Sequence, residues 1–246
     1  MKILYCKNCN KKLTKIQVYK KGQFCCKGCA TSFRQKANDP NISKLKDKDL
    51  LYYILGLIWS DGNLNKEEDK ISLTLKDLDL IESLYPIFSD INKRKIYKYK
   101  HKNKFMSYTL INTNCDFINF CKKKGLIPNK SFSIDVNNIP KKYFYAFVRG
   151  VFDGDGSVYI QNRYKNFIYL GVTIVSANCS FLKKLTLDFE KNHIEYNIYL
   201  DSRKSLYYLK IGKKQSIKNF YKYIYKRNSK IYLKRKKDIF INNDIV

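Results

Sequence analysis

Acidic residues are scarce in this chain. Only 21 aspartate and glutamate residues stand against 49 lysine and arginine residues, which leaves a formal net charge of +28 over 246 residues. Self-repulsion at this charge density lowers stability, so folding does not explain the excess. A compositional bias toward lysine, asparagine, isoleucine and tyrosine contributes, but it would not by itself keep the acids so few. The imbalance favours a polyanionic partner, of which nucleic acid is the commonest.

Long apolar segments are missing too. No run approaches the ~18 apolar residues of a membrane span, and the first residues lack the apolar stretch of a secretion signal. We therefore expect an intracellular protein without membrane contact, in the cytoplasm of a bacterium or a phage-infected cell, or in an organelle. The two histidines, His101 and His193, do not lie in a His-Asn-His context, and paired Gly-Ile-Tyr motifs are absent. Nuclease classes built on those motifs fit this chain poorly.

Cysteine is concentrated near the N-terminus, where five of the eight cysteines lie within residues 6–29. In a reducing compartment such a cluster is better explained by metal binding than by disulfides. Two pairs of thiols separated by about fifteen residues suit a tetrahedral Cys₄ site, so we expect a structural Zn²⁺ ion. The expected ligands are Cys6, Cys9, Cys25 and Cys29, with Cys26 as the alternative to Cys25.

The remainder of the chain repeats itself. Residues 50–64 read LLYYILGLIWSDGNL, and residues 144–158 read FYAFVRGVFDGDGSV. One offset of 94 residues aligns both the glycines and the acids of the two runs, which is a stronger indication than either match alone. The aligned pairs are Gly56 with Gly150 (150 − 56 = 94) and Asp61 with Asp155 (155 − 61 = 94).

Each copy predicts the order helix-strand-strand-helix-strand-strand-helix, so the fold class is α+β with two pseudo-symmetric αββαββα repeats. After the two apolar runs, the periodicity predicts helices at 77–88, 115–124, 178–191 and 216–225, and strands at 63–66, 71–75, 95–100, 105–112, 157–163, 167–176, 196–201 and 205–211. The predicted domains are a zinc-binding module at 1–35, a linker at 36–48, a first repeat at 49–138 and a second repeat at 139–246.

Glycine in a helix interior costs up to about 1 kcal/mol relative to alanine, which close packing of the two apolar helices at Gly56 and Gly150 would offset. Asp61 and Asp155 would then project side by side from the helix ends. Two adjacent carboxylates repel each other there, and a divalent cation between them relieves the repulsion. Oxygen ligands suit Mg²⁺, which can activate water against phosphodiesters. The expected Mg²⁺-binding residues are Asp61, Asp155, Gly62 and Gly156.

Residues 54–62 (ILGLIWSDG) and 147–156 (FVRGVFDGDG) resemble the two motifs of single-chain LAGLIDADG homing endonucleases. The resemblance runs from about residue 47 to the end and includes the basic segments 125–131 and 232–237. The first motif departs from the pattern, because Trp59-Ser60 replaces the usual small and acidic residues. The resemblance implies a monomer that acts as a pseudo-dimer, with two antiparallel sheets forming a saddle on DNA and the motif helices at the interface.

The resemblance also implies metal-dependent, site-specific hydrolysis of both strands of double-stranded DNA, with Asp61 and Asp155 as the catalytic acids. It assigns Lys130 and Lys236 as basic residues that polarise solvent near the scissile phosphates; contact with the DNA backbone is the alternative role, and Arg235 can replace Lys236. The alternatives to cleavage are maturation of a host intron RNA and non-cleaving DNA binding, and retention of both acids favours cleavage. Candidate DNA-contacting residues are Lys95, Tyr97, Tyr99, Arg163, Lys165, Arg203, Lys210 and Arg235.

Overall fold

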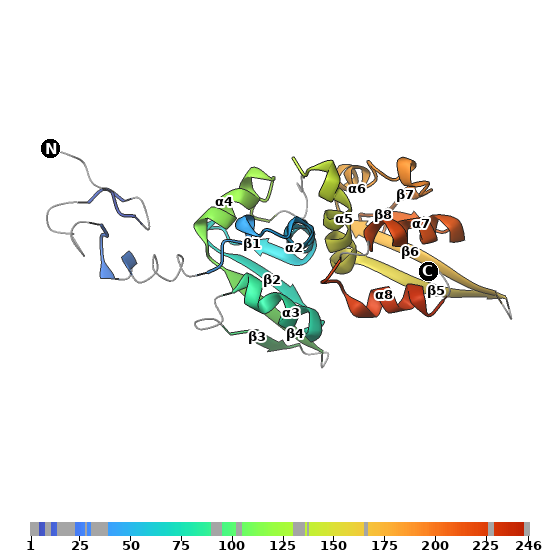
Figure 1. The fold of residues 1–246 in the computed structure, drawn as a ribbon, viewed down its shortest axis with the longest axis horizontal. Coiled ribbons are helices and arrows are strands. Elements are labelled where there is room, and N and C mark those ends of the chain that lie inside the picture. The colour runs from blue at the N-terminus through green and yellow to red at the C-terminus, as the bar shows by residue number, and fades with distance from the viewer. Residues whose placement is uncertain are drawn as a thin grey trace.

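The computed structural model of the chain describes two similar halves and part of the N-terminal segment (Figure 1). No helix in the described ranges combines the length and the apolar character needed to cross a bilayer. The described residues are 5–7, 11–13, 23–27, 29–30, 39–89, 95–101, 105–129, 136, 138–164, 167–225 and 229–243, without the side chains of 161–169.

The two halves have the same order of elements, as the repeat predicts, with additions in the second. After the short helix η1 (Ile42–Lys44), the first half contains α2 (Lys48–Asp61), β1 (Gly62–Leu64), β2 (Ile71–Leu75), α3 (Leu78–Phe88), β3 (Tyr97–Lys100), β4 (Met106–Asn112) and α4 (Cys115–Lys123). The second half contains α5 (Lys141–Asp155), β5 (Gly156–Tyr164), β6 (Phe167–Ser176), α6 (Cys179–Leu185), η2 (Glu190–Asn192), β7 (Asn197–Asp201), β8 (Leu206–Ile211), α7 (Lys214–Ile224) and α8 (Lys234–Ile241).

Each half forms a four-stranded antiparallel sheet, and the orders β1-β2-β4-β3 and β5-β6-β8-β7 are equivalent. The predicted α+β class with two matching repeats is therefore confirmed. In each sheet the alternation of side chains turns one face to the helices, where Leu73 pairs with Leu110 and Ile174 with Leu209. The opposite face carries mainly polar and aromatic side chains, and we call it the polar face. Its members include Asn63, Ser72, Thr74, Tyr97, Tyr99 and Thr109 in the first sheet, and Ser157, Tyr159, Thr173, Tyr199, Tyr208 and Lys210 in the second.

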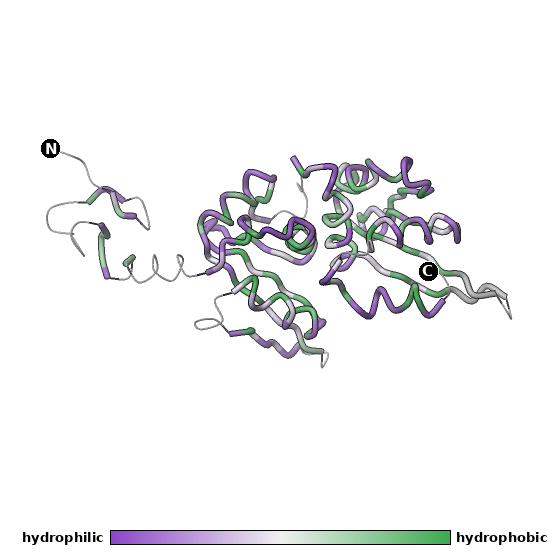
Figure 2. Tube along the Cα trace, in the orientation of Figure 1, coloured by the Kyte–Doolittle hydropathy of each residue, from purple (hydrophilic) through white to green (hydrophobic). Residues whose placement is uncertain are grey.

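The two motif helices, α2 and α5, lie where the halves meet (Figure 1). Nine consecutive residues of α2, Leu51–Trp59, are buried. Figure 2 shows the apolar character of this helix at the contact between the halves. Helix α2 begins after Asp47, whose carboxylate accepts a hydrogen bond from the Leu50 N–H at 3.1 Å. The core of the molecule is thus continuous through the α2–α5 contact.

The structure differs from the sequence prediction at residues 178–191, where one helix was expected. Helix α6 ends at Leu185 because the chain tightens: the Thr186 and Leu187 N–H groups bond to carbonyls three residues back, and Thr186 Oγ1 donates to the Lys183 carbonyl at 2.9 Å. Helix α8 was not predicted, because its charged sequence KRKKDIFI shows only a short apolar pattern.

Residues 39–47, which the composition assigns to the predicted linker, pack on the first half. Asp39 is 3% exposed and accepts hydrogen bonds from Thr113 N (2.7 Å) and Thr113 Oγ1 (2.8 Å). Ile42 is buried in the main core. The first half therefore includes the chain from Asp39 onward.

Candidate active site

Helices α2 and α5 touch backbone to backbone at two glycines. A Cβ atom on Gly56 would lie 2.2 Å from the Phe147 carbonyl oxygen and 2.8 Å from the Gly150 Cα atom. A Cβ atom on Gly150 would lie 2.2 Å from the Tyr53 carbonyl oxygen. The contact is reciprocal, and only residues without a side chain allow it. This crossing fixes the relative position of everything that follows the two helices.

Both motif helices end on an aspartate. Asp61 closes α2 and Asp155 closes α5, and in each case the next residue is a glycine that begins the first strand of a sheet. A Cβ atom on Gly154 would lie 2.6 Å from Asp61 Oδ2, so the Asp61 carboxylate lies against the second motif, one residue from Asp155. Asp61 is half-buried and Asp155 is exposed. The structure therefore places the Asp61 carboxylate against the residue that precedes Asp155, where the two motif helices end.

Lys236, on α8, caps the end of α5. Its side chain is buried, and Nζ donates to the carbonyl oxygens of Phe152 and Asp153 (2.7 Å each) and also contacts those of Gly154 and Gly156. These acceptors occupy the three N–H bonds of the ammonium group. The role expected for Lys236, polarisation of solvent near the scissile phosphates, stays a prediction beside this capping contact. The Gly156 carbonyl oxygen accepts from the ammonium group, and its role as a metal ligand stays a prediction.

Electrostatics around Lys236 tie it to the candidate site. Burial lowers the pKa of Lys236 to about 8, while attraction by Asp153, Asp61 and Asp155 opposes the decrease. Both candidate metal-binding acids thus lie within electrostatic reach of one ammonium group. The positive charge at the end of α5 offsets part of the repulsion between carboxylates and carbonyl ends.

Asp153 is a buried acid that sequence reasoning did not select. It is 2% exposed and accepts hydrogen bonds from Tyr53 Oη (2.8 Å), the Leu233 N–H (2.8 Å) and Tyr225 Oη (3.3 Å). Burial raises its pKa to about 6, and hydrogen bonding with Leu233 and attraction by Lys236 limit the increase. The signal was the first acid in FDGDGS, which aligns with Trp59 of the first motif (153 − 59 = 94).

Arg149 is the second missed residue, although a charge inside the apolar run FVRGVF could have revealed it. Its guanidinium group is fully buried, pairs with Asp49 at 2.5 Å, and donates to the Ile224 carbonyl at 3.1 Å. It also lies over the Tyr53 ring, 4.8 Å from the centroid. Asp49 and Tyr53 belong to α2, so Arg149 links the two halves at the helix crossing.

The candidate DNA-contacting residues occupy different positions. Tyr97, Tyr99 and Lys210 lie on the polar faces of the sheets. Lys95 is exposed before β3, and Arg203 pairs with Asp201 in the β7–β8 turn. Arg235 instead forms a two-pronged ion pair with Asp77 (2.6 and 3.0 Å), across the two halves. Lys130, Lys165 and the side chain of Arg163 lie outside the described residues.

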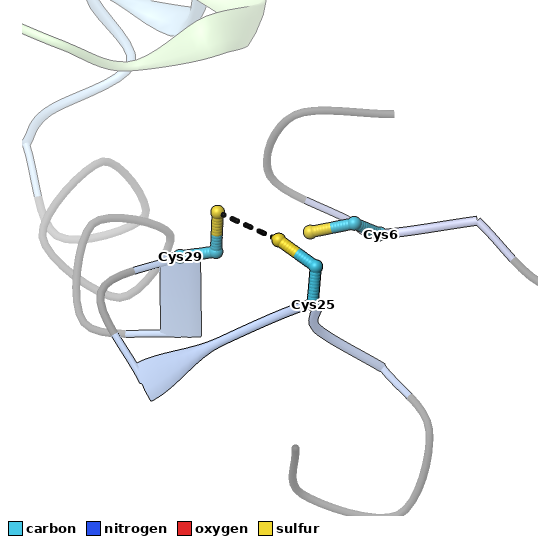
Figure 3. A group of neighbouring side chains, drawn as sticks. All are labelled: Cys6, Cys25 and Cys29. Atoms are coloured by element: carbon cyan, nitrogen blue, oxygen red, sulfur yellow. Dashed lines mark hydrogen bonds between the residues drawn. The ribbon is translucent and has the colours of Figure 1, made fainter. Parts of the chain in front are cut away.

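Three cysteines of the N-terminal cluster meet in space (Figure 3). The sulfur atoms of Cys6, Cys25 and Cys29 lie within 4.8 Å of one another, and those of Cys25 and Cys29 are 3.3 Å apart. Cys26 is not in this group; its sulfur accepts a hydrogen bond from the Cys29 N–H at 3.3 Å. The fourth expected ligand, Cys9, lies outside the described residues. Cys25 thus belongs to the group of three sulfur atoms, and the choice between Cys25 and Cys26 as a zinc ligand stays a prediction.

Comparison with solved structures identifies similar folds. The chain is similar to the homing endonuclease I-WcaI bound to its DNA recognition sequence, with a TM-score of 0.57, 13% identity and coverage of 87% of this chain and 92% of that one. It is also similar to the N-terminal LAGLIDADG domain of DUF199/WhiA, with a TM-score of 0.50, 18% identity and coverage of 87% and 96%. At these identities the likeness shows the fold alone.

Sequence comparisons agree with the fold. The chain is 30% identical over 168 residues to an uncharacterized protein of Methanocaldococcus jannaschii, which covers 64% of this chain and 59% of that protein. It spans less than two thirds of the length of the curated relatives that it matches. The family model described as LAGLIDADG-like domain matches residues 48–125 and 144–225, one segment in each half. The chain therefore belongs to the LAGLIDADG-like domain family.

Proposed function

We propose that this protein is a divalent-metal-dependent, site-specific double-strand DNA endonuclease. The observation that carries the proposal is the position of Asp61, whose carboxylate lies against Gly154, the residue before Asp155. One acid from each half at a pseudo-symmetric crossing suits a reaction that is carried out on both strands of a duplex. The net charge of +28 supports a polyanionic substrate.

The residues at the crossing suit a hard divalent cation. Asp61 and Asp155 supply oxygen donors, which Mg²⁺ prefers, and the Gly62 carbonyl is a further candidate ligand. The carbonyl ends of α2 and α5 add partial negative charge at the same place and strengthen the attraction for a cation. When bound, Mg²⁺ would neutralise phosphate charge and activate the attacking water. The two carboxylates would hold that ion, and Lys236 would hold the end of α5 in place.

The polar faces of the two sheets would position the duplex. The strands β1 and β5 begin directly after Asp61 and Asp155, so each sheet extends from one of the acids. Phosphate contacts from exposed lysines fix the register of a protein on DNA, and side chains on the polar faces select the bases. Among the candidates, Lys210 on the polar face of the second sheet supports this part of the proposal.

Cleavage is tested with Mg²⁺ and a library of duplex fragments that includes the gene's own insertion locus rejoined without the gene. We expect discrete double-strand cuts with short cohesive ends. Asp61→Asn and Asp155→Asn should each reduce cleavage by at least about 100-fold, because each loses a metal-binding charge. Glu82→Gln, at an exposed acid on α3, is the matched control and should cleave normally.

The alternatives predict a different result. Tight binding of the target without cutting, at every divalent cation tried, would contradict the endonuclease and favour a non-cleaving DNA-binding regulator. Preferential binding and folding of a host intron RNA would favour a maturase. Cutting that survives both aspartate substitutions would show that the reaction uses other residues.

We also propose that the N-terminal module holds a structural Zn²⁺ ion, through Cys6, Cys25 and Cys29 with Cys9 as the fourth ligand. Three thiols within 4.8 Å of one another form most of a tetrahedral Cys₄ set. A segment of this size cannot bury enough apolar surface to fold alone, and metal binding supplies the missing free energy.

Zinc content provides the test for the module. We expect one zinc ion per purified chain, lost in Cys25→Ser and retained in Cys26→Ser. Of these two cysteines, Cys25 belongs to the group of three sulfur atoms and Cys26 does not. Removal of zinc with a chelator should leave the thermal transition of the two repeats in place. Zinc that is lost in Cys26→Ser and kept in Cys25→Ser would contradict the ligand assignment, and chains without zinc would contradict the site.

A further inference from the structure

The outer edge of the first sheet carries two exposed tyrosines on one face. Strand β3 is the last strand in the order β1-β2-β4-β3, and Tyr97 and Tyr99 are 50% and 63% exposed. The register places Tyr97 opposite Thr109 and Tyr99 opposite Ser107, so both tyrosines point to the polar face of the sheet. Aromatic rings of this size are normally buried or packed against a partner. A pair that is exposed on one face therefore indicates a ligand.

Tyr99 is supported by its neighbours while its ring remains exposed. The ring centroids of His101 and Tyr99 are 4.7 Å apart, with an interplanar angle of 83°. This edge contact leaves the exposed surface of the Tyr99 ring available to a ligand. His101 in turn stacks on Phe105 (4.2 Å, 16°) and contacts Ser107 Oγ at 3.0 Å, while Lys76 lies over the Phe105 ring. This cluster holds Tyr99 in one orientation, so little conformational entropy is lost when a ligand packs on it.

The spacing of the two tyrosines matches a nucleobase. Residues i and i+2 of a strand are about 6.6 Å apart, and side chains stand roughly perpendicular to the sheet. Consecutive bases of a DNA strand are separated by about 3.4 Å. The strand spacing between Tyr97 and Tyr99 is thus about twice the separation of stacked bases, which is the spacing that one base needs to stack between two rings.

The surrounding charge suits a phosphate backbone. Lys95, Lys98 and Lys100 are exposed next to Tyr97 and Tyr99 in the sequence, and Lys98 and Lys100, opposite Tyr108 and Met106, lie on the other face of this edge strand. Surfaces that bind single strands combine aromatic rings that take the bases with nearby cations that follow the phosphates, and here the exposed lysines surround the edge of the sheet that carries the rings.

The second sheet differs at the equivalent place. Counting along the register from the first strand, Tyr199 takes the position of Tyr97, but its ring is stacked on Tyr208 (5.4 Å, 9°). Asp201 takes the position of Tyr99 and pairs with Arg203. The aromatic pair is thus confined to the first sheet among the described strands, and a shared structural role in the two repeats does not explain it.

We propose that Tyr97 and Tyr99 form a stacking site for unpaired nucleobases, so that the edge of the first sheet binds a short single-stranded segment of DNA or RNA. In a duplex the faces of the bases are covered by their neighbours, and only their edges are accessible in the grooves. The exposed surfaces of these rings can therefore be covered by a base only where the base is unpaired. This site acts independently of the proposed cleavage.

The test measures binding of a labelled 12-nucleotide thymidine strand, a uridine strand and a matched duplex to the full chain, without added Mg²⁺. We expect Tyr97→Ala and Tyr99→Ala each to weaken single-strand binding by roughly 5- to 100-fold, with a smaller change for the duplex. Tyr97→Phe and Tyr99→Phe should bind like the wild type because the ring is retained. Tyr199→Ala, at the equivalent position of the second sheet, is the matched control and should retain single-strand binding.

A spectroscopic arm reports stacking directly. The single tryptophan, Trp59, is 1% exposed, so Tyr99→Trp adds an exposed reporter over a buried background. We expect the thymidine or uridine strand to quench the fluorescence of this reporter, and the stronger of the two responses distinguishes DNA from RNA.

Equal binding by wild type and both alanine variants, or an unquenched reporter with bound strand, would overturn the proposal. Loss of duplex binding to the same extent as single-strand binding would also overturn it and assign the tyrosines to groove contacts. Because cleavage is not measured, failure here leaves the endonuclease proposal untouched.

Discussion

Individual residues at the end of α5 show how the fold manages buried charge. Asp153 is removed from water and accepts hydrogen bonds from two tyrosines and a backbone N–H. Lys236 brings a compensating positive charge to the same helix end through backbone carbonyls. A buried carboxylate and a buried ammonium group are tolerated here because each is surrounded by hydrogen-bonding groups of suitable polarity.

The pH dependence of stability should reveal Asp153. Its pKa of about 6 is above the ordinary 3.8, so the folded protein binds this proton more tightly than the unfolded chain does. The resulting stabilisation is complete below about pH 4 and is lost as the pH rises through 6; a shift of this size corresponds to about 3 kcal/mol. We expect Asp153→Asn to become more stable relative to wild type as the pH rises from 4 to 7.

Urea unfolding of both proteins across this pH range measures the difference between their free energies of unfolding. Taking this difference removes the contribution of the other carboxylates, which is the same in both proteins. Retention of cleavage by Asp153→Asn would assign the residue to the interface alone. Parallel pH profiles for the two proteins would contradict the raised pKa.

At the scale of elements, the crossing of α2 and α5 depends on two glycines. The backbones approach so closely that a methyl group on Gly56 has no space, because the contacting atoms are backbone atoms of the other helix. A side chain there would separate the helices and shift the ends that carry Asp61 and Asp155. The crossing therefore couples stability to the geometry of the candidate site.

Substitution at the crossing should separate these effects from helix propensity. Alanine favours a helix over glycine by about 1 kcal/mol, so Gly56→Ala would stabilise an unpacked helix. At the crossing we expect instead a net loss of about 3 kcal/mol or more, from overpacking against backbone. Gly212→Ala is the matched control, because a Cβ atom there meets no other atom within 4 Å. Thermal unfolding checks the expectation, and similar transitions for both variants would contradict the tight contact.

Elements themselves were largely predictable from periodicity. The strands and the helices α3, α4 and α7 lie close to the predicted ranges, because alternation and helical spacing are properties of neighbouring residues. Helix α6 ended early because Thr186 bonds back to its own turn, which a pattern of apolar residues does not show. Helix α8 was missed because it is stabilised through Lys236 and Phe240, which are buried against distant segments.

The whole molecule is held together by contacts that cross between the repeats. Arg149 pairs with Asp49 in the interior, Asp153 accepts from Tyr53, and Arg235 pairs with Asp77 near the surface. The buried pair matters most when broken, because the surviving partner is left as an uncompensated charge. The exposed pair is screened by water and contributes little.

Asp49→Asn should therefore destabilise the protein strongly, by about 3–5 kcal/mol, since it leaves the Arg149 charge buried without its acid. Arg149→Leu copies the first repeat, where Leu55 holds this place (149 − 55 = 94), and should cost less because it removes the buried charge. Arg203→Gln breaks an exposed pair and should change stability by less than about 0.5 kcal/mol. Denaturant unfolding ranks the three variants; an equal cost for Asp49→Asn and Arg203→Gln would contradict the role of the buried pair.

The sequence by itself determined the repeat, the α+β class, the paired acids at the ends of the motif helices and the cysteine cluster. These features are local in the chain or recur at one offset, so spacing is enough to reveal them. Tertiary structure alone decided the capping role of Lys236, the burial of Asp153 and Arg149, the membership of Cys25 in the thiol group, and the stacking of Tyr199 on Tyr208 in the second sheet, in contrast to the exposed Tyr97 and Tyr99 of the first. Burial, hydrogen-bond partners and ring contacts depend on residues far apart in the chain, and their free energies exist only once the two repeats have packed together.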